Sequence, residues 1–462
     1  MLKHRVRRLH LVGIGGSGMC GIAEVLLTLG YEVSGSDLKA TEVTERLRKG
    51  GAVISIGHAE SNVRDAQAVV YSSAVEMDNP ELVAARRLGI PIIRRAEMLA
   101  ELMRMKYGIG ISGTHGKTTT TSMTGLVLDA AGLDPTVVIG GRLNSLGTHA
   151  RLGAGEYMVV EADEAYGSFL FLSPVIAVIT NVDDDHLDHY RSIVRLQAAF
   201  VEFANKVPFY GTVIACADDP GVRQVLPEIH RRVVTYGLNP GAILYAEGLK
   251  LAPGSSSCRV LYDGRELGEL KLPVPGRHNV SNALASVAVG LELDVPFETA
   301  VRALGAYQGV ARRLQLKGEK KGVRVYDDYG HHPTEIRATL EAARQLISRA
   351  RGRLWVLFQP HRYSRVNLLR ESFGGAFESA DHAVLTEIYP AGEVPIPGVT
   401  AQLILDSVRR HGRPDTKLVP DLDEACSAVV AGVQSGDVVV TMGAGDVNRC
   451  GDRILKLLEG KA

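Results

Sequence analysis

The sequence predicts an α/β protein built from three units, each with a mostly parallel sheet covered by helices. Glycine-rich turns join an apolar strand to a helix at two places, 13–18 and 113–117. The apolar runs of the second unit, after the second of these turns, are continuous instead of alternating, which is typical of parallel strands covered on both faces. A chain of 462 residues also exceeds one ordinary domain, and two to four domains are expected.

Composition excludes several classes of protein. Lys plus Arg equal Asp plus Glu at 52 each, so there is no basic footprint for nucleic acid or for an anionic membrane. The five cysteines are scattered without a C-x-x-C pair, which indicates a reducing compartment. The apolar stretch after the basic segment Lys3–Arg8 is too short for a signal peptide, and no run is long enough to span a membrane. We therefore expect a cytoplasmic protein without nucleic-acid or membrane partners.

The first unit carries a nucleotide-binding pattern. Gly13-x-Gly15-x-x-Gly18 follows a strand and precedes a helix expected from about Met19 to Leu29, and the next strand ends at Ser36-Asp37. This is a dinucleotide fingerprint with an acidic residue near the expected distance. The same turn serves any pyrophosphate, so an NAD-dependent oxidoreductase is one of the hypotheses left open. A fresh strand–loop–helix unit places a boundary near Met105.

The second unit opens with a phosphate loop. The apolar strand 107–111 leads into Gly113-x-x-Gly116-Lys117-Thr118, and a helix follows. Backbone N–H groups and the helix dipole favour a phosphate there, Lys117 supplies a cation, and the Thr118 hydroxyl suits Mg²⁺. Strict P-loop spacing requires glycine at position 111, where this chain has Ile111. The pattern still predicts a nucleoside triphosphate site.

Two carboxylate-rich segments follow expected strands of this unit, which we place at 135–139, 157–161, 175–180 and 212–216. The segments are 161–164 and 181–189, and ligands of open α/β sheets bind at such strand ends. Glu161 closes an apolar strand and is the best Mg²⁺ ligand of the set, whereas Asp183, Asp184 and Asp185 are equally well explained as solvated loop acids. His186 fits either a metal ligand or a helix-cap residue.

The rest of the chain predicts a hairpin around Asp263-Gly264, a helix opening at 277–282, a linker at 308–314 and a third α/β unit. His278, Asn279 and Asn282 lie on the first turn of that helix and suit an adenine contact. In the third unit, a helix should run from about Thr334 to Ile347, and strands should span 354–358 and 438–441. The loop after the first of these strands carries arginines suited to a carboxylate or phosphate.

Six motifs together resemble the Mur ligases of peptidoglycan synthesis over the whole chain. They are Gly113-Thr-His-Gly-Lys-Thr-Thr, Glu161-Ala-Asp-Glu, Asn181-x-x-x-Asp185-His-Leu-Asp, Gly276-Arg-His-Asn, Asp327-Asp-Tyr-Gly-His-His-Pro-Thr-Glu and Gln359-Pro-His-Arg-Tyr-Ser-Arg. The resemblance implies a Rossmann-like UDP-substrate domain (1–105), a central P-loop-type ATPase domain (106–312) and a Rossmann-like domain that closes over an amino acid (313–462). It also assigns the N-terminal glycine loop to a UDP pyrophosphate.

The implied activity is ATP-driven amide formation. L-alanine would be joined to the lactyl carboxylate of UDP-N-acetylmuramate through an acyl phosphate, with ATP and two Mg²⁺ ions. The partners implied are these small molecules, and the protein is expected to be a monomer or weak homodimer.

The resemblance also implies roles for single residues. Lys117, His186 and Arg365 would be catalytic, and Thr118, Glu161 and His186 would hold Mg²⁺. The ATP contacts would be Gly113, Thr114, His115, Gly116, Lys117, Thr118, Thr119, His278, Asn279, Asn282, Arg313 and Asp328. The substrate contacts would be Gly13, Gly15, Gly16, Ser17, Gly18 and Asp37 for the UDP part, with Arg362 and Arg365 for the acyl phosphate or amino acid.

One departure from the family pattern is visible. Where relatives of this activity have a Ser-Asp pair after Glu-Ala-Asp-Glu, this chain has Ala165-Tyr166, which puts local substrate contacts in doubt. Besides the oxidoreductase, two hypotheses stay open: a recycling ligase that attaches a tripeptide to the same nucleotide sugar, and a nucleotide-binding regulatory module without catalysis.

Overall fold

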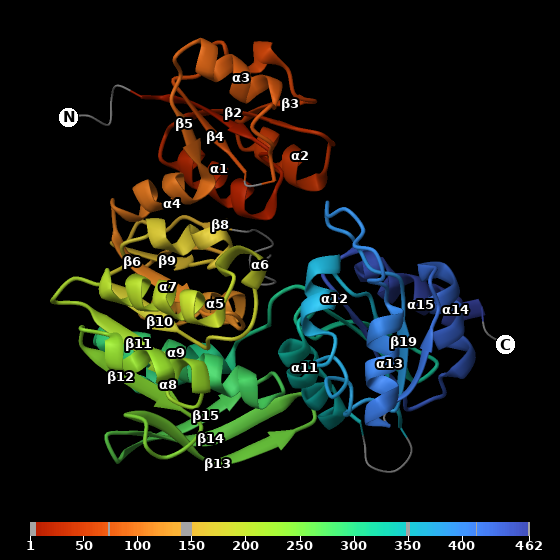
Figure 1. The fold of residues 1–462 in the computed structure, drawn as a ribbon. Coiled ribbons are helices and arrows are strands. Elements are labelled where there is room, and N and C mark those ends of the chain that lie inside the picture. The colour runs from red at the N-terminus through yellow and green to blue at the C-terminus, as the bar shows by residue number, and fades with distance from the viewer. Residues whose placement is uncertain (1–5, 73, 140–149, 348–351, 413, 461–462) are drawn as a thin grey trace. The chain divides into compact units, whose positions relative to one another are not determined.

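The computed structural model describes residues 6–72, 74–139, 150–347, 352–412 and 414–460 (Figure 1). The chain forms two compact units. The first contains Met1–Ala246, Val260–Gly268 and Asn282–Leu304, and the second contains Glu247–Arg259, Glu269–Ser281 and Gly305–Ala462. Within the described residues, no helix has the length and apolar character needed to cross a membrane.

The N-terminal sheet has five parallel strands in the order β3-β2-β1-β4-β5. Its strands are β1 (Arg8–Val12), β2 (Glu32–Asp37), β3 (Val53–Ile56), β4 (Ala68–Tyr71) and β5 (Ile92–Arg94). Its helices are α1 (Ser17–Thr28), α2 (Glu42–Lys49), η2 (Glu60–Val63), α3 (Pro80–Arg87) and α4 (Arg95–Met103). The carboxyl ends of all five strands therefore lie at one edge, where the glycine loop follows β1.

The central sheet has ten strands in the order β15-β14-β13-β12-β11-β10-β6-β9-β7-β8, and the boundary between the two units runs through its β13–β15 end. The strands are β6 (Tyr107–Ser112), β7 (Thr136–Val138), β8 (Ala150–Arg151), β9 (Tyr157–Glu161), β10 (Ile176–Ile179), β11 (Thr212–Cys216), β12 (Val233–Gly237), β13 (Leu244–Ala252), β14 (Ser255–Tyr262) and β15 (Arg265–Leu272). The accompanying helices are α5 (Lys117–Ala130), η3 (Ala165–Phe171), α6 (Leu187–Tyr190), α7 (Ile193–Asn205), α8 (Pro220–Val225), η4 (Leu226–Glu228), α9 (Arg277–Glu292) and α10 (Phe297–Gly305). Strand β6 is paired in parallel with β9 and β10, so the phosphate loop is flanked by both of their carboxyl ends.

The third sheet has the order β16-β17-β21-β18-β19-β20, and only its edge pair β16–β17 is antiparallel among the pairs described. The strands are β16 (Gln315–Lys320), β17 (Val323–Asp328), β18 (Leu354–Phe358), β19 (His382–Leu385), β20 (Asp415–Leu418) and β21 (Val438–Met442). The helices are α11 (Pro333–Gln345), α12 (Tyr363–Leu369), α13 (Gln402–His411), α14 (Leu422–Gly432), η5 (Asp446–Arg449) and α15 (Cys450–Gly460). Two separate apolar clusters bury its two faces, as continuous apolar strands require.

Trp355, the one tryptophan of the sequence, lies in β18 of this sheet. Its ring stacks on His382 of β19 with centroids 4.0 Å apart, and its indole N–H donates to Asp437 at 3.1 Å. The ring is only 5% exposed, so it serves as a packed core residue with its polar atom satisfied.

The α/β fold class and the mostly parallel sheets are confirmed. The strands expected at 157–161, 212–216 and 354–358 have those bounds, and the hairpin around Asp263-Gly264 is formed by β14 and β15. The remaining strands and helices differ from expectation by one or two residues at their ends, because terminal turns depend on local capping that periodicity does not encode.

A buried polar network lies within the N-terminal sheet and its helices. The carboxylate of Glu81 in α3 is fully buried and accepts hydrogen bonds from the Ser36 hydroxyl at 2.6 Å and the Asn62 amide at 2.5 Å. His10 Nε2 lies 3.7 Å from the same carboxylate. Burial raises the pKa of Glu81, but the nearby His10 ring and the hydrogen bonds from Ser36 and Asn62 outweigh it and hold the pKa at about 2. The carboxylate is therefore charged at neutral pH.

We expect Glu81 to stabilise this part of the fold in a pH-dependent way. Its pKa falls from 4.5 to about 2 on folding, so its contribution is present above about pH 4.5 and is lost as the pH drops towards 2. The full contribution is about 3 kcal/mol. Urea dependence of hydrogen-exchange protection, followed in peptides from residues 6–72, should separate wild type from Glu81→Gln at pH 7. The difference should shrink by about half at pH 3 and nearly vanish near pH 2. A difference that is constant over this range would contradict the assignment.

Candidate functional site

The phosphate loop between β6 and α5 depends on two glycines with positive φ, Gly113 at 130° and Gly116 at 82°. A Cβ at Gly113 would collide with the Thr180 hydroxyl, and a Cβ at Gly116 would lie 2.6 Å from Asn282 Oδ1. Neither position tolerates a side chain. Asn282, expected near the nucleotide, is therefore packed directly against the loop.

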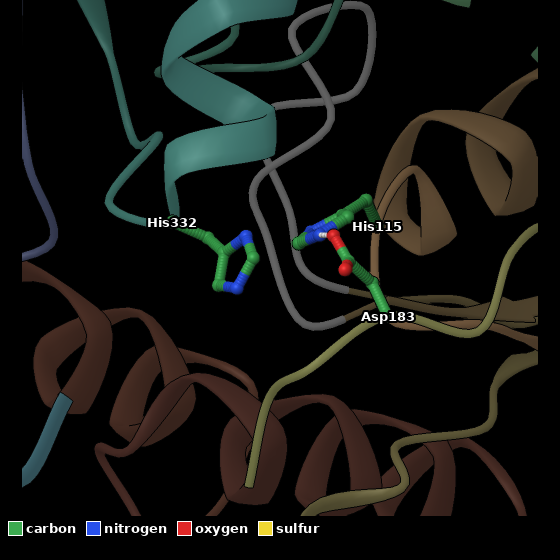
Figure 2. Close-up of side chains that lie close together, drawn as sticks. All are labelled: His115, Asp183 and His332. Carbon is green, nitrogen blue, oxygen red and sulfur yellow. Dashed lines mark hydrogen bonds and ion pairs between the residues drawn. The ribbon is translucent and has the colours of Figure 1, made fainter. Parts of the chain in front are cut away.

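The end of β10 holds this loop in place. Asn181 Oδ1 accepts from the His115 backbone N–H at 2.7 Å, and the Thr180 hydroxyl donates to the His115 carbonyl at 2.6 Å. The His115 ring is bonded to Asp183, with Nε2 and Oδ2 2.9 Å apart (Figure 2). The Thr114 hydroxyl accepts from the Asp183 N–H at 3.0 Å. The loop is thus preorganised by its neighbouring strand.

Lys117, the first residue of α5, is held by a buried ion pair. Its Nζ lies 2.7 Å from Glu164 Oε2 and donates to the carbonyls of Gly113 at 2.7 Å and Thr114 at 3.1 Å. Burial lowers the pKa of Lys117, but the negative charges of Glu164 and Asp163 raise it by more than burial lowers it. The resulting pKa lies above the usual value for lysine. The side chain is a fixed cation at the mouth of the loop.

Oxygen ligands lie beside this cation. The Thr118 hydroxyl, in the first turn of α5, donates to both carboxylate oxygens of Glu161 at 3.0 and 3.1 Å. Thr119 is buried in the same turn. A hydroxyl from the helix after β6 and a carboxylate at the end of the adjacent strand β9 are hard ligands of the kind that Mg²⁺ prefers.

A second group of metal-ligating atoms is formed by Asp163, Glu164 and His186, which lie within 4.8 Å of one another. Glu164 is 1% exposed, and its Oε1 has no hydrogen-bond partner among the described residues; His186 Nε2 lies 3.8 Å away. His186 precedes α6 with φ at 55° and makes no side-chain cap bond. Of the two roles open from sequence, capping by its side chain is therefore not observed.

The remaining adenine candidates lie at the start of α9, in the second unit. Asn279 Nδ2 donates to the Pro275 carbonyl at 2.7 Å, which closes the turn before the helix. Burial, aided by the Arg313 charge, lowers the pKa of His278 to about 4, so its ring is neutral at physiological pH. A neutral, half-buried imidazole suits contact with an uncharged base.

Arg313 precedes β16, and Asp328 ends β17, the neighbouring strand of the third sheet. Asp328 is buried and accepts from the backbone N–H groups of Leu314 and Gly330, both at 2.7 Å. Burial raises its pKa to about 6, against the Arg313 charge. The Arg313 guanidinium lies 3.5 Å from Glu335 Oε1 and 5.5 Å from the Tyr329 ring centroid.

Arg362 and Arg365 lie where β18 passes into α12. Arg362 has φ at 67° and its N–H donates to the Tyr389 carbonyl at 2.9 Å, so the helix begins at a strained residue. Arg365 is 8% exposed, and its Nη1 lies 3.2 Å from His361 Nδ1. Both arginines are thus fixed at the carboxyl edge of the third sheet.

The N-terminal glycine loop is supported by β2. Gly13 and Ile14 donate their N–H groups to the Ser36 carbonyl at 2.9 and 3.0 Å, and the Gly15 N–H donates to Asp37 Oδ2 at 2.9 Å. Gly16 precedes α1, and Gly18 lies within it. A Cβ atom added at Gly18 would lie 2.7 Å from Arg95 Nη1. Ser17 begins α1, and its side chain is outside the described residues. The Asp37 side chain therefore stabilises the backbone of the glycine loop directly.

Tyr166, at the departure from the family pattern, has φ at 54° and is 53% exposed. Its ring meets His189 edge-on with centroids 5.7 Å apart. The residue thus lies two positions from Glu164 on an accessible, strained turn.

Sequence reasoning gave no individual role to three residues that shape the site, Glu164, Thr180 and Asn181, although Glu164 and Asn181 lie in motifs that it identified. Glu164 lies within the acidic segment after β9, but no spacing rule distinguishes it from Asp163. Thr180 and Asn181 follow an apolar strand that pairs beside β6, and a polar pair at such a strand end is the available signal.

The ion pair gives a testable consequence for stability. Lys117→Ala should destabilise the protein by about 3–5 kcal/mol, because Glu164 stays buried without its cation. Adding Glu164→Gln should recover much of this loss by removing the unpaired charge. The measurement is a double-mutant cycle by urea unfolding, with the exposed pair Lys271–Glu269 as matched control. Substitutions in the control pair should change the free energy of unfolding by less than about 1 kcal/mol. Equal losses for both pairs would contradict the burial argument.

Comparison with known proteins assigns the family. Three family models match in order: the Mur ligase family, catalytic domain at residues 8–107, the Mur ligase middle domain at 111–290, and the Mur ligase, glutamate ligase domain at 312–445. The UDP-N-acetylmuramate–L-alanine ligase of Geobacter sp. (strain M21) is 54% identical over 455 residues, covering 98% of each chain.

Solved structures agree with this assignment. The UDP-N-acetylmuramate–alanine ligase of Thermotoga maritima has a TM-score of 0.82 and 32% identity, covering 98% of this chain and 99% of that one. A murein peptide ligase of Psychrobacter arcticus has a TM-score of 0.73 at 24% identity, covering 99% of each chain, and this likeness concerns the fold alone. The chain has a three-domain α/β fold and belongs to the Mur ligase family, whose members are ATP-dependent ligases.

Proposed function

We propose that this chain is the ligase that joins L-alanine to the lactyl carboxylate of UDP-N-acetylmuramate at the expense of ATP. One observation carries the proposal: a preorganised phosphate loop places the Lys117–Glu164 pair beside two groups of metal-ligating atoms. The Geobacter relative, which is similar over 98% of both chains, is a UDP-N-acetylmuramate–L-alanine ligase, and we infer the same substrates for this chain.

The chemistry requires such a site. A carboxylate is inert towards an amine until one of its oxygens becomes a leaving group. Attack of the lactyl carboxylate on the γ-phosphorus of ATP forms an acyl phosphate and releases ADP. The neutral amine of L-alanine then attacks the acyl carbon, the amide bond forms, and inorganic phosphate leaves while the amine loses a proton. Two anions must approach each other, so fixed positive charge is essential.

The phosphate loop supplies part of that charge. Gly113, Gly116 and Thr119 would cradle the phosphates through their backbone N–H groups at the start of α5, and Thr114 and His115, whose N–H groups bond Asn181, would line the loop beside them. Lys117 would neutralise the terminal phosphates, and the bond network from Thr180 and Asn181 keeps this geometry fixed. Asn282, packed on Gly116, would contact the nucleotide, together with His278 and Asn279.

The residues present fit two Mg²⁺ ions. Thr118 and Glu161 would hold one, and His186 with Glu164 would hold the other, because Glu164 Oε1 is buried without a partner among the described residues. Bound there, Mg²⁺ would neutralise phosphate and carboxylate charge. Glu164 would then bind both a metal and Lys117.

The domain boundaries proposed are those at 105 and 312, which the spans of the three family models support. The first domain would bind the UDP part through its glycine loop, with Asp37 as the brace of that loop. In the third domain, Arg313 and Asp328 are proposed for the nucleotide, and Arg362 and Arg365 for the acyl phosphate or L-alanine.

The recycling ligase is the second candidate, because its chemistry on the same nucleotide sugar would use the same phosphate loop. The relatives favour the alanine ligase over it and over an NAD-dependent oxidoreductase. The Ala165-Tyr166 departure makes a direct comparison of substrates worthwhile.

Phosphate release should be measured with Mg-ATP, UDP-N-acetylmuramate and either L-alanine or the tripeptide L-alanyl-γ-D-glutamyl-diaminopimelate. We expect release with L-alanine, with formation of the alanyl product by mass spectrometry, and little with the tripeptide. A preference for the tripeptide would overturn the alanine assignment, and release with neither would overturn the ligase assignment.

The metal assignment predicts a changed Mg²⁺ requirement. Glu161→Gln keeps size and removes charge, so the Mg²⁺ concentration for half-maximal rate should rise at least about 10-fold. Glu156→Gln, at an exposed position just before the same strand, is the matched control and should leave it unchanged. If both variants keep the wild-type Mg²⁺ dependence, Glu161 is not a ligand.

A further inference from the structure

The loop after β3 places a histidine at the ligand-binding edge of the N-terminal sheet. His58 follows β3, and Ser36 and Asp37 end the adjacent strand β2, which pairs with β1 before the glycine loop. All three therefore lie at the carboxyl edge, where parallel sheets bind nucleotides. The proposed function gives His58 no role.

The inner side of the His58 ring is tied to the buried network. His58 Nδ1 lies 3.1 Å from Glu81 Oε2 and 3.0 Å from the Ser36 hydroxyl oxygen. The Ser36 hydroxyl donates its own proton to Glu81 Oε2 at 2.6 Å. Both neighbours of Nδ1 therefore offer it acceptors only, and in the neutral ring the proton resides on Nδ1.

This arrangement leaves the other nitrogen, Nε2, as an acceptor. The His58 side chain is 15% exposed, whereas Glu81 is fully buried, so the ring bridges the network and the surface. Further bonds fix Glu81 from its other oxygen, from Asn62 at 2.5 Å and the Ala59 N–H at 3.4 Å. The orientation of the His58 ring is thus fixed by the Glu81 carboxylate, which is itself held by several hydrogen bonds.

The same residues support the glycine loop. The Ser36 carbonyl accepts from Gly13 and Ile14, while its hydroxyl donates to Glu81. One buried carboxylate consequently fixes both the strand end that braces the proposed pyrophosphate loop and the histidine beside it.

We propose that His58, positioned by Glu81, is a specificity-determining residue whose Nε2 accepts a hydrogen bond from the uridine part of the nucleotide sugar. The inference rests on the proposed function. Uridine offers two kinds of donor, the N3–H of uracil and the ribose hydroxyls. Cytosine has a lone pair at N3, so a base contact would discriminate against a cytidine nucleotide, whereas a ribose contact would not.

Binding of UDP alone, measured by titration calorimetry without ATP or L-alanine, tests this. His58→Asn retains an inner polar contact with Glu81 and lacks Nε2, so it should weaken UDP binding about 3- to 10-fold. The KM for ATP should stay unchanged. Glu81→Gln should weaken UDP binding similarly, whereas Glu60→Gln, in the exposed Arg87 pair of the neighbouring helix η2, should not. Binding of CDP identifies the hydrogen-bond donor. If the wild type binds CDP more weakly than UDP, the donor is the uracil base; if it binds both equally, the donor is a ribose hydroxyl.

The ring tautomer gives a readout that a merely structural role would not move. In ¹⁵N-histidine-labelled full-length protein, the His58 signals, assigned by their loss in His58→Asn, should show Nδ1 protonated in wild type. In Glu81→Gln the new amide can donate to Nδ1, and the proton should move to Nε2. Addition of UDP should shift the Nε2 signal of wild type.

Two results would overturn the inference: wild-type affinity for UDP in His58→Asn, or an Nε2-protonated His58 in wild type. Both leave the ligase assignment intact. Failure of the wild-type protein to bind UDP would overturn both the inference and the proposed function.

Discussion

The ion pair between Lys117 and Glu164 is the interaction on which the rest of the central site depends. It joins the start of α5 to the segment after β9, which are separate strand–loop units of one sheet. Each charge would be costly to bury alone, and each is retained because the other lies 2.7 Å away. The second oxygen of Glu164 is then directed towards His186. A single carboxylate thereby sets the spacing between the cation and the imidazole, and the proposed chemistry needs both.

The two glycine loops of the first unit are stabilised in the same physical way. A glycine-rich loop has few side chains with which to fix itself, so a neighbouring strand end supplies most of the bonds. In the N-terminal sheet, Ser36 and Asp37 of β2 bond the N–H groups of Gly13–Gly15; in the central sheet, Thr180 and Asn181 after β10 bond His115. Preorganisation of this kind reduces the entropy lost on binding.

Much of this organisation is predictable from sequence because it is local. Continuous apolar runs gave the strands 157–161, 212–216 and 354–358, and the glycine spacing located both loops. The contacts that complete the sites are not local. Asn282 lies against Gly116 across more than a hundred residues of chain, and Glu81 of α3 meets Ser36 of β2 across 45 residues. Asp328, expected at a nucleotide, bonds two backbone N–H groups. Such pairings follow from strand order, which periodicity does not determine.

The stacking of Trp355 on His382 has a practical consequence. Since the sequence contains one tryptophan, the intrinsic indole emission of this protein originates entirely in the third sheet. The ring of His382 packs against the indole, so this emission reports how β18 and β19 pack together. Urea or ligand titrations followed by tryptophan fluorescence would therefore report on the second unit and would not detect events at the two glycine loops of the first.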